Sequence, residues 1–199
     1  MKIIPVMYDY ECAWKTSKYK NKLTPVIPLA CSIDKCNEIK KTDPKNIHIL
    51  HGINRPDEKG SYKILSALNR ISKEFDNVVI HTPEKLSQTE YFKIFSQVDI
   101  AIDQCRCHSY GMNAIYSMLY GHVTLAPADD KHCLSFGIQS SPIISIYDDE
   151  DNIYEALKEL VINCSRLDEI KMLTRGYAEN FHSPSRVCTK ILDIIEGTG

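Results

Sequence analysis

Two basic residues, Arg55 and Lys59, lie four positions apart in the segment HGINRPDEKGS, just before a predicted helix start at 60–61. An arginine can grip two phosphate oxygens at once, and a lysine adds a point charge. The amides and the dipole of a helix start favour the same anion. The segment therefore predicts a diphosphate-binding site. The alternative is that both cations are solvated beside Asp57 and Glu58.

A second candidate site surrounds Gly111 in the stretch HSYGMNAIYSMLYG, residues 108–121, where a predicted strand gives way to a predicted helix. Because glycine has no Cβ, the backbone here can approach a ligand closely. The free amides of Gly111, Met112 and Asn113 would point out of the helix start. The stretch predicts a site for an anion or a hydroxyl group, unless the glycine serves only close packing of strand and helix.

Cysteine and histidine lie close together in CRCH, residues 105–108, and again in the pair at 132–133. Thiolate and imidazole groups are metal ligands, but this spacing is not a usual zinc spacing, and no second paired cysteine motif follows. We therefore expect no metal. His108 is interpreted as a polar residue of the rim, and Cys105 and Cys107 as packing residues.

Short apolar runs alternate with helical patterns, and this alternation predicts the elements that position these residues. Strands are predicted at 47–53, 77–82, 98–103, 122–126 and 142–146, with a short strand as an option at 25–30 in the irregular first 46 residues. Helices are predicted at 61–75, 87–97, 110–120, 152–164, 166–181 and 183–196. Ser87 with a glutamate three residues later forms a capping box, and Ser183 is the predicted N-cap of the last helix.

Strands that alternate with helices predict an α/β fold, here a Rossmann-like parallel sheet with helices on both faces and a helical C-terminus. Ligands of such sheets bind at the carboxyl ends of the strands, near helix N-termini. The loops at 52–60, 82–87, 103–111 and 126–137 should therefore share one rim.

The chain has 199 residues, a formal net charge of −2 and 43% hydrophobic residues, which is ordinary globular composition. The charge gives no indication of a nucleic acid partner, and no apolar run approaches the ~20 residues of a transmembrane segment. Residues 1–15 make a poor signal peptide. The eight cysteines are scattered, and we interpret them as mostly reduced thiols. We therefore expect a cytoplasmic protein.

Four stretches together resemble the C-terminal, donor-binding half of a GT-B-fold retaining glycosyltransferase of the group 1 type. In chain order they are HGINRPDEKGSYKILSALNRI, YFKIFSQVDIAID, YGMNAIYSMLYGHVTLA and TRGYAENFHSPSRVCTKILDI. The resemblance runs over residues 25–197. It implies that the chain binds a nucleotide-sugar, with Arg55 and Lys59 on the donor diphosphate and with no metal or other cofactor.

The same resemblance implies sugar or ribose contacts from the segment around the glycine turn, namely from His108, Gly111, Met112, Asn113 and Tyr116. In that family two glutamates flank the turn, one near the donor sugar and one on the ribose hydroxyls; here those positions hold His108 and Tyr116. A phenol can still bond a ribose hydroxyl, but a neutral hydrogen bond contributes about 1 kcal/mol against ~1.5–3 kcal/mol for a charged one. Alternatively, Tyr116 is only a packed aromatic residue.

The acceptor-binding domain of that family is not recognisable in the chain. Residues 1–30 resemble the interdomain connection, and residues 31–199 resemble the nucleotide-sugar-binding domain with its C-terminal helix at 183–196. A separate acceptor-binding domain or chain is therefore the implied partner. The last helix is expected to expose an apolar stripe, unless it folds onto its own sheet: Val187, Ile191, Leu192, Ile194 and Ile195.

The leading hypothesis is a glycosyltransferase, or its donor-binding part, that transfers a sugar from a nucleotide-sugar to an unknown acceptor. The alternative is a non-catalytic nucleotide-sugar-binding or protein-interaction module, because both glutamates are replaced. Half of a nucleotide-sugar epimerase is a weaker third option. The nucleobase is expected near residues 81–86.

Overall fold

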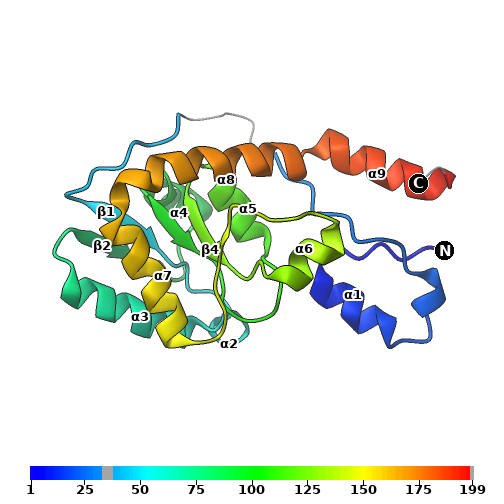
Figure 1. Cartoon of the computed structure of the whole chain (residues 1–199), viewed down its shortest axis with the longest axis horizontal. Coiled ribbons are helices and arrows are strands. Elements are labelled where there is room, and N and C mark those ends of the chain that lie inside the picture. Colours follow the sequence, from blue (N-terminus) through cyan, green and yellow to red (C-terminus); the bar gives the residue numbers. More distant parts are fainter. Residues whose placement is uncertain (33–37, 198–199) are drawn as a thin grey trace.

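The computed structural model describes residues 1–32 and 38–197. Its centre is a five-stranded sheet in which all neighbouring strands are parallel, in the order β2-β1-β3-β4-β5 (Figure 1). The strands are β1 (Ile47–Leu50), β2 (Val78–His81), β3 (Ile100–Ile102), β4 (Val123–Ala126) and β5 (Ile144–Ser145). The predicted parallel sheet is confirmed, although each strand is shorter than its apolar run.

Helices cover both faces of the sheet, as the sequence predicted (Figure 1). One face carries α3 (Ser61–Glu74) and α7 (Glu150–Ile162). The other carries α4 (Gln88–Phe95), α5 (Met112–Leu119) and α8 (Leu167–Phe181). The predicted capping box at the start of α4 is present.

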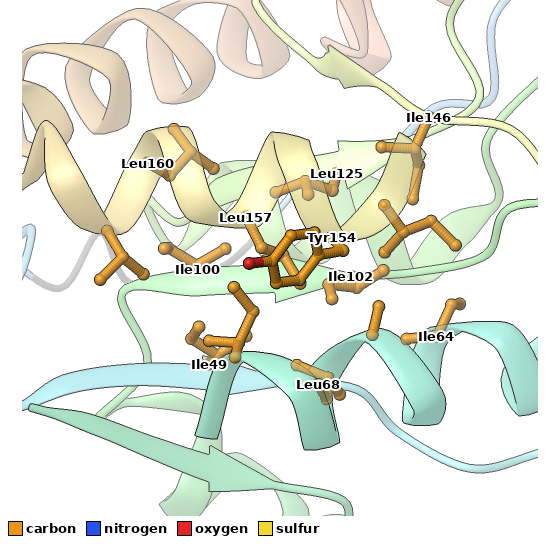
Figure 2. Close-up of a cluster of buried hydrophobic side chains, with 14 of the residues drawn as sticks. Ile49, Ile64, Leu68, Ile100, Ile102, Leu125, Ile146, Tyr154, Leu157 and Leu160 are labelled. Carbon is orange, nitrogen blue, oxygen red and sulfur yellow. The ribbon is translucent and has the colours of Figure 1, made fainter. Parts of the chain in front are cut away.

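The larger hydrophobic core cluster lies between the sheet and the pair α3 and α7 (Figure 2). Ile49 and Ile100 of the strands meet Leu68 of α3 and Leu157 of α7, and all four are buried. Because both faces of the sheet are covered, its strands are mainly apolar rather than strictly alternating. This core fixes the strand ends from which the loops of the functional rim emerge.

Three helices lie in segments without a helical pattern: α1 (Tyr8–Lys15), α2 (Pro56–Lys59) and α6 (Asp130–Phe136). The 4 residues of α2 and the 7 of α6 are too short for a recognisable period, and none of the 8 residues of α1 is buried, so α1 has no core-facing apolar stripe. Two short 3₁₀ turns complete the elements, η1 (Lys20–Lys22) and η2 (Cys164–Arg166).

The optional strand at 25–30 was wrong. Residues 25–30 run beside the N-terminal segment, and the Ile27 amide donates to the Pro5 carbonyl at 3.0 Å, but no ladder forms. Pro25 and Pro28 lack the backbone N–H groups that a strand ladder needs.

The last helix, α9 (Pro184–Glu196), extends away from the body of the molecule beside the N-terminus (Figure 1). Ser183 is its N-cap residue, as predicted, and Val187 is buried. Leu192 and Ile195 remain 53% and 65% exposed. The apolar stripe is therefore exposed in part, at Leu192 and Ile195, whereas Ile191 and Ile194 are half-buried.

Seven cysteines lie in the described parts of the chain, and all seven are free; Cys36 lies outside these parts.

Within residues 1–32 and 38–197, no helix combines the length and the apolar character needed to cross a bilayer. The segment 1–30 is tied to the body at its end, since the Leu29 carbonyl accepts a hydrogen bond from Nδ1 of His182 at 2.7 Å. The division into residues 1–30 and 31–199 stays a prediction.

Candidate functional site

A pocket of about 430 Å³ opens at the carboxyl ends of β1 and β2 and at the first turns of α5. The strand order reverses here, because β2 lies on one side of β1 while β3, β4 and β5 lie on the other. Such a switch point is where open parallel sheets bind ligands. The lining comes from two predicted rim loops and from α2, α4 and α5: Gly52, Ile53, Asn54, Lys59, Pro83, Lys85, Leu86, Tyr91, Phe92, Asn113 and Tyr116.

Lys59 lies in the wall of this pocket and forms a buried ion pair with Asp103. The distance from Nζ to Oδ1 is 2.7 Å, and the two side chains are 6% and 2% exposed. Lys59 is the last residue of α2, and Asp103 directly follows β3. The attraction offsets part of the cost of burying both charges. Lys59 therefore keeps further N–H donors for a ligand, but its charge is balanced by the carboxylate.

Asp103 also fixes the start of α5. Its second oxygen, Oδ2, accepts the amide hydrogen of Gly111 at 3.1 Å. Because the Gly111 amide is engaged, the donors left at this helix start are the amides of Met112, Asn113 and Ala114, which have no intrahelical acceptor. The Met112 side chain packs against the core cluster under α5 rather than lining the pocket.

Asn113 and Tyr91 join α5 to α4 across the pocket. The Tyr91 hydroxyl donates to Oδ1 of Asn113 at 3.1 Å, and burial raises the pKa of Tyr91 to about 12. The phenol therefore stays a protonated donor at neutral pH. Its ring lies against Gly52, where an added Cβ would approach the Tyr91 hydroxyl to 3.1 Å. Gly52 thus allows this ring to close one side of the pocket.

Tyr116 lies three positions after Asn113 on the same face of α5, and both residues line the pocket. The ring of Tyr116 packs edge-on against Phe92, with 6.4 Å between the ring centroids. The nearby Cys31 thiol, together with burial, raises the pKa of Tyr116. Tyr116 is therefore both a packed aromatic residue and a neutral phenol in the pocket wall.

The sequence matches no family model and no curated protein. Its fold, however, is shared with solved glycosyltransferase structures. HepE of Anabaena, solved with UDP-glucose, aligns with a TM-score of 0.70 at 12% identity over 98% of this chain and 64% of that chain. Sucrose-phosphate synthase of Thermosynechococcus elongatus aligns with a TM-score of 0.64 at 12% identity, over 98% of this chain and 57% of that chain. WaaG, a glycosyltransferase of lipopolysaccharide biosynthesis, aligns with a TM-score of 0.60 at 13% identity, over 98% of this chain and 63% of that chain.

This chain is a partial GT-B fold. It spans less than two thirds of the length of HepE, of the synthase and of WaaG. The sequence resemblance to one half of such a fold is therefore confirmed at the level of the fold. The roles of individual residues stay predictions.

Arg55 does not line the pocket of this partial GT-B fold, although its neighbour Asn54 does. Arg55 caps α2 in the left-handed conformation with φ 49°, and its side chain is exposed. Its carbonyl accepts the Lys59 amide hydrogen at 3.1 Å, but its side chain makes no hydrogen bond or ion pair with the rest of residues 1–32 and 38–197. The structure thus places one of the two predicted diphosphate ligands in the wall and leaves the other free in solvent.

His108 also lies outside the pocket lining of the partial GT-B fold. It faces a polar cluster between α1 and α6, where Nδ1 lies 2.6 Å from Oδ2 of Asp129. The predicted sugar or ribose residues are therefore divided. Asn113 and Tyr116 line the pocket, Gly111 and Met112 form the helix start beside it, and His108 belongs to the second cluster.

The pocket lining is positive and aromatic. Lys59 and Lys85 are its charged residues, and among the described residues none of the lining side chains is a carboxylate. Lys85 lies 3.4 Å from Glu84, but both side chains are exposed, so water screens this pair. Such a lining can attract an anion at one end and contact a planar ring at the other.

Two residues of the site were missed by the sequence analysis, Asp103 and Tyr91, whereas Lys85 lies in the segment 81–86 that was expected near the base. Asp103 had a usable signal, since it directly follows a strand at the rim where ligands bind. Tyr91 gave none, because an aromatic residue in an amphipathic helix is an ordinary feature. In the part of the chain that the structure describes, no group of three His, Cys, Asp or Glu side chains could hold a metal ion.

Proposed function

We propose that this pocket binds a nucleotide-sugar, and that the chain is a glycosyltransferase or the donor-binding part of one. The observation that carries the proposal is the position of Lys59 and the start of α5 on the two sides of the switch point between β1 and β3. Both features attract a diphosphate, and no described lining carboxylate repels it. HepE, which has the same fold, was solved with UDP-glucose.

In this proposal the diphosphate binds Lys59 and the Met112 and Asn113 amides, with Arg55 closing from the exposed loop. The sugar and ribose contact Asn113 and Tyr116, and the base lies near residues 81–86. These cations and amides would stabilise the departing diphosphate without a metal. An acceptor-binding part would be supplied by a separate domain or chain, and we place the protein in the cytoplasm.

A second candidate is a non-catalytic nucleotide-sugar-binding module. One observation favours it: the charge of Lys59 is already balanced by Asp103, so the pocket offers less stabilisation to a departing diphosphate. Catalysis needs more stabilisation of the transition state than of the bound donor. A binding module has no such requirement.

Calorimetric titration of the chain with uridine, UDP, GDP and their sugar conjugates tests the binding. We expect UDP or GDP to bind together with its sugar conjugates. Lys59→Met should weaken the affinity for UDP about tenfold or more, because a charged hydrogen bond is lost, and should hardly change the affinity for uridine, which has no phosphate. Lys93→Met is the matched control, since Lys93 is exposed on α4 and does not line the pocket. Folded protein that binds none of these ligands would refute the proposal.

Two further measurements separate the enzyme from the module. Release of UDP from bound UDP-glucose supports the enzyme, whereas binding without release supports the module. Tyr116→Glu restores a carboxylate in the pocket wall and should tighten UDP binding about tenfold if the ribose hydroxyls face this position. Unchanged or weaker binding would place the ribose elsewhere.

A further inference from the structure

His108 and Asp129 form a hydrogen-bonded imidazole–carboxylate pair that the pocket does not include. Nδ1 and Oδ2 are 2.6 Å apart, and the side chains are 37% and 41% exposed. His108 lies in the loop after β3, and Asp129 lies in the loop after β4. The carboxyl ends of parallel strands meet at one edge of the sheet. The pair therefore lies at the same edge as the pocket and is open to solvent.

The two neighbours of the imidazole fix its tautomer. An ionised carboxylate can only accept, so Nδ1 carries the ring hydrogen and donates it to Asp129. Although burial acts in the opposite direction, the hydrogen bonds from His108 and from two backbone amides lower the pKa of Asp129, which keeps it ionised. On the other side, Nε2 lies 3.4 Å from Nζ of Lys131, an ammonium group that can only donate. Nε2 therefore keeps its lone pair.

Further contacts hold the ring in place from α1 and from its own loop. The carboxylate of Asp9 accepts the backbone amide hydrogen of His108 at 3.1 Å. The ring of Tyr8 packs edge-on against the imidazole, with 5.4 Å between the centroids. Nε2 of Gln104 donates to the Ser109 carbonyl at 2.8 Å and closes the loop. The imidazole is thus oriented, as a catalytic base must be.

Asp103 connects this loop to the pocket. One of its oxygens pairs with Lys59 in the pocket wall, and the other accepts the Gly111 amide, three residues after His108. Both ends of the segment 103–111 are therefore fixed to the wall of the pocket. A ligand bound at Lys59 and a group that approaches Nε2 of His108 would therefore both lie beside the short segment 103–111.

We propose that His108 accepts the proton of the hydroxyl group that attacks the sugar, and that Asp129 is its positioning residue. The inference rests on the proposed function. The hydroxyl oxygen forms a bond to the anomeric carbon while the bond from this carbon to the diphosphate oxygen breaks. The diphosphate leaves with the electron pair, and the hydroxyl proton passes to Nε2. With water as the hydroxyl compound, the products are the free sugar and the nucleoside diphosphate.

The test is release of UDP from UDP-glucose by the full chain, with water as the acceptor. His108→Gln should slow release about 100-fold or more, because the base is lost. Asp129→Asn keeps the N-cap of α6, since asparagine caps helices well. Its amide, however, turns a donor toward Nδ1, so that the ring hydrogen moves to Nε2, and we expect release to slow at least tenfold.

Asp130→Asn is the matched control, because Asp130 is the next residue, is exposed, and undergoes the same change of charge. It should change the rate less than twofold, and all three variants should bind UDP within twofold of the unaltered chain. Nitrogen NMR of the His108 ring supplies a readout that a merely structural role would not move. The hydrogen should lie on Nδ1 in the unaltered chain and on Nε2 in Asp129→Asn.

Two results would overturn the inference while leaving nucleotide binding intact. In one, UDP binds but the unaltered chain releases no UDP from UDP-glucose. In the other, His108→Gln or Asp129→Asn releases UDP as fast as the unaltered chain. Failure of UDP and of every other nucleotide to bind is a different result, which would overturn the proposed function and this inference with it.

Discussion

Lys59 and Asp103 meet in an ion pair of 2.7 Å that joins the loop after β1 to the loop after β3. These loops leave the sheet on the two sides of the switch point, so the pair joins them at the wall of the candidate pocket, which Lys59 lines. Because the second carboxylate oxygen holds the Gly111 amide, the same residue also sets the position of α5. The buried carboxylate of Asp103 thus balances the charge of Lys59 and fixes the start of α5.

Asp103→Ala is expected to lower the free energy of unfolding by about 3–5 kcal/mol, because it leaves a buried ammonium and a buried amide without partners. Urea denaturation followed by circular dichroism measures the loss. Glu84→Ala is the control, since it removes the exposed partner of the exposed Lys85 and should cost no more than about 0.5 kcal/mol. A loss below about 1 kcal/mol for Asp103→Ala would show that the pair contributes little.

Gly52→Ala is expected to weaken nucleotide binding more than it weakens the fold. The new Cβ would lie 3.1 Å from the Tyr91 hydroxyl and 3.2 Å from its ring, so the ring must move and its bond to Asn113 must lengthen. We expect about a tenfold weaker Kd for UDP by calorimetry, equivalent to ~1.4 kcal/mol. The double variant Gly52→Ala, Tyr91→Phe separates the steric contact from the loss of the hydrogen bond to Asn113, because phenylalanine lacks the hydroxyl oxygen that lies closest to the new Cβ. Unchanged affinity in the single variant would place the ligand away from Tyr91.

The sequence was sufficient to predict the sheet and the long helices, because these elements have clear periodicity. The runs that became β1 and β3 are mainly apolar and rich in isoleucine, and the helix over Ser61–Glu74 repeats its apolar residues at helical spacing. Short elements carry no such pattern. The four residues of α2 and the seven of α6 are held by capping residues and tertiary contacts rather than by an amphipathic stripe.

The candidate site was partly predictable for the same reason. The position of Lys59 followed from the rule that ligands bind at the carboxyl ends of parallel strands, that of Asn113 from the predicted helix start, and that of Tyr116 from the family resemblance. All three residues line the pocket. The rule could not predict that Arg55 takes a left-handed conformation, which leaves its side chain in solvent. Nor could it predict that Asp103 neutralises Lys59, because that depends on the register and rotamers of two loops far apart in the sequence.

Gly60→Ala is expected to destabilise the protein more than Gly137→Ala, although both glycines have positive φ, 71° and 65°. At Gly137 an added Cβ meets nothing within 4 Å, so only the left-handed backbone costs about 1–2 kcal/mol. At Gly60 it would lie 2.4 Å from Sγ of Cys105, which adds ~1–3 kcal/mol of overpacking. Urea denaturation measures both, and Cys105→Ala should recover part of the loss only in the Gly60 variant. Equal losses at the two glycines would contradict the clash.

The protein is expected to lose stability steeply between pH about 6.5 and 4. Burial lowers the pKa of His51, His132 and His182 to about 4 and that of His122 to about 3. In the unfolded chain these groups have a pKa near ~6.5, so the unfolded state binds more protons throughout this window. Stability then rises with pH and falls on acidification, by about 1.4 kcal/mol per pH unit for each histidine. Thermal unfolding between pH 7.5 and 4.5 measures the slope.

His132→Phe tests this origin directly, because the His132 ring packs against Tyr110 and Phe136, and neither ring nitrogen has a partner among the described residues. Phenylalanine preserves the ring contacts and leaves no hydrogen bond broken. Since one histidine with a lowered pKa is removed, we expect the pH slope to fall by about 1.4 kcal/mol per pH unit and the variant to gain stability relative to the unaltered chain as the pH falls. A slope that stays the same in His132→Phe would mean that His132 titrates alike in the folded and unfolded states, and that other groups set the acid sensitivity.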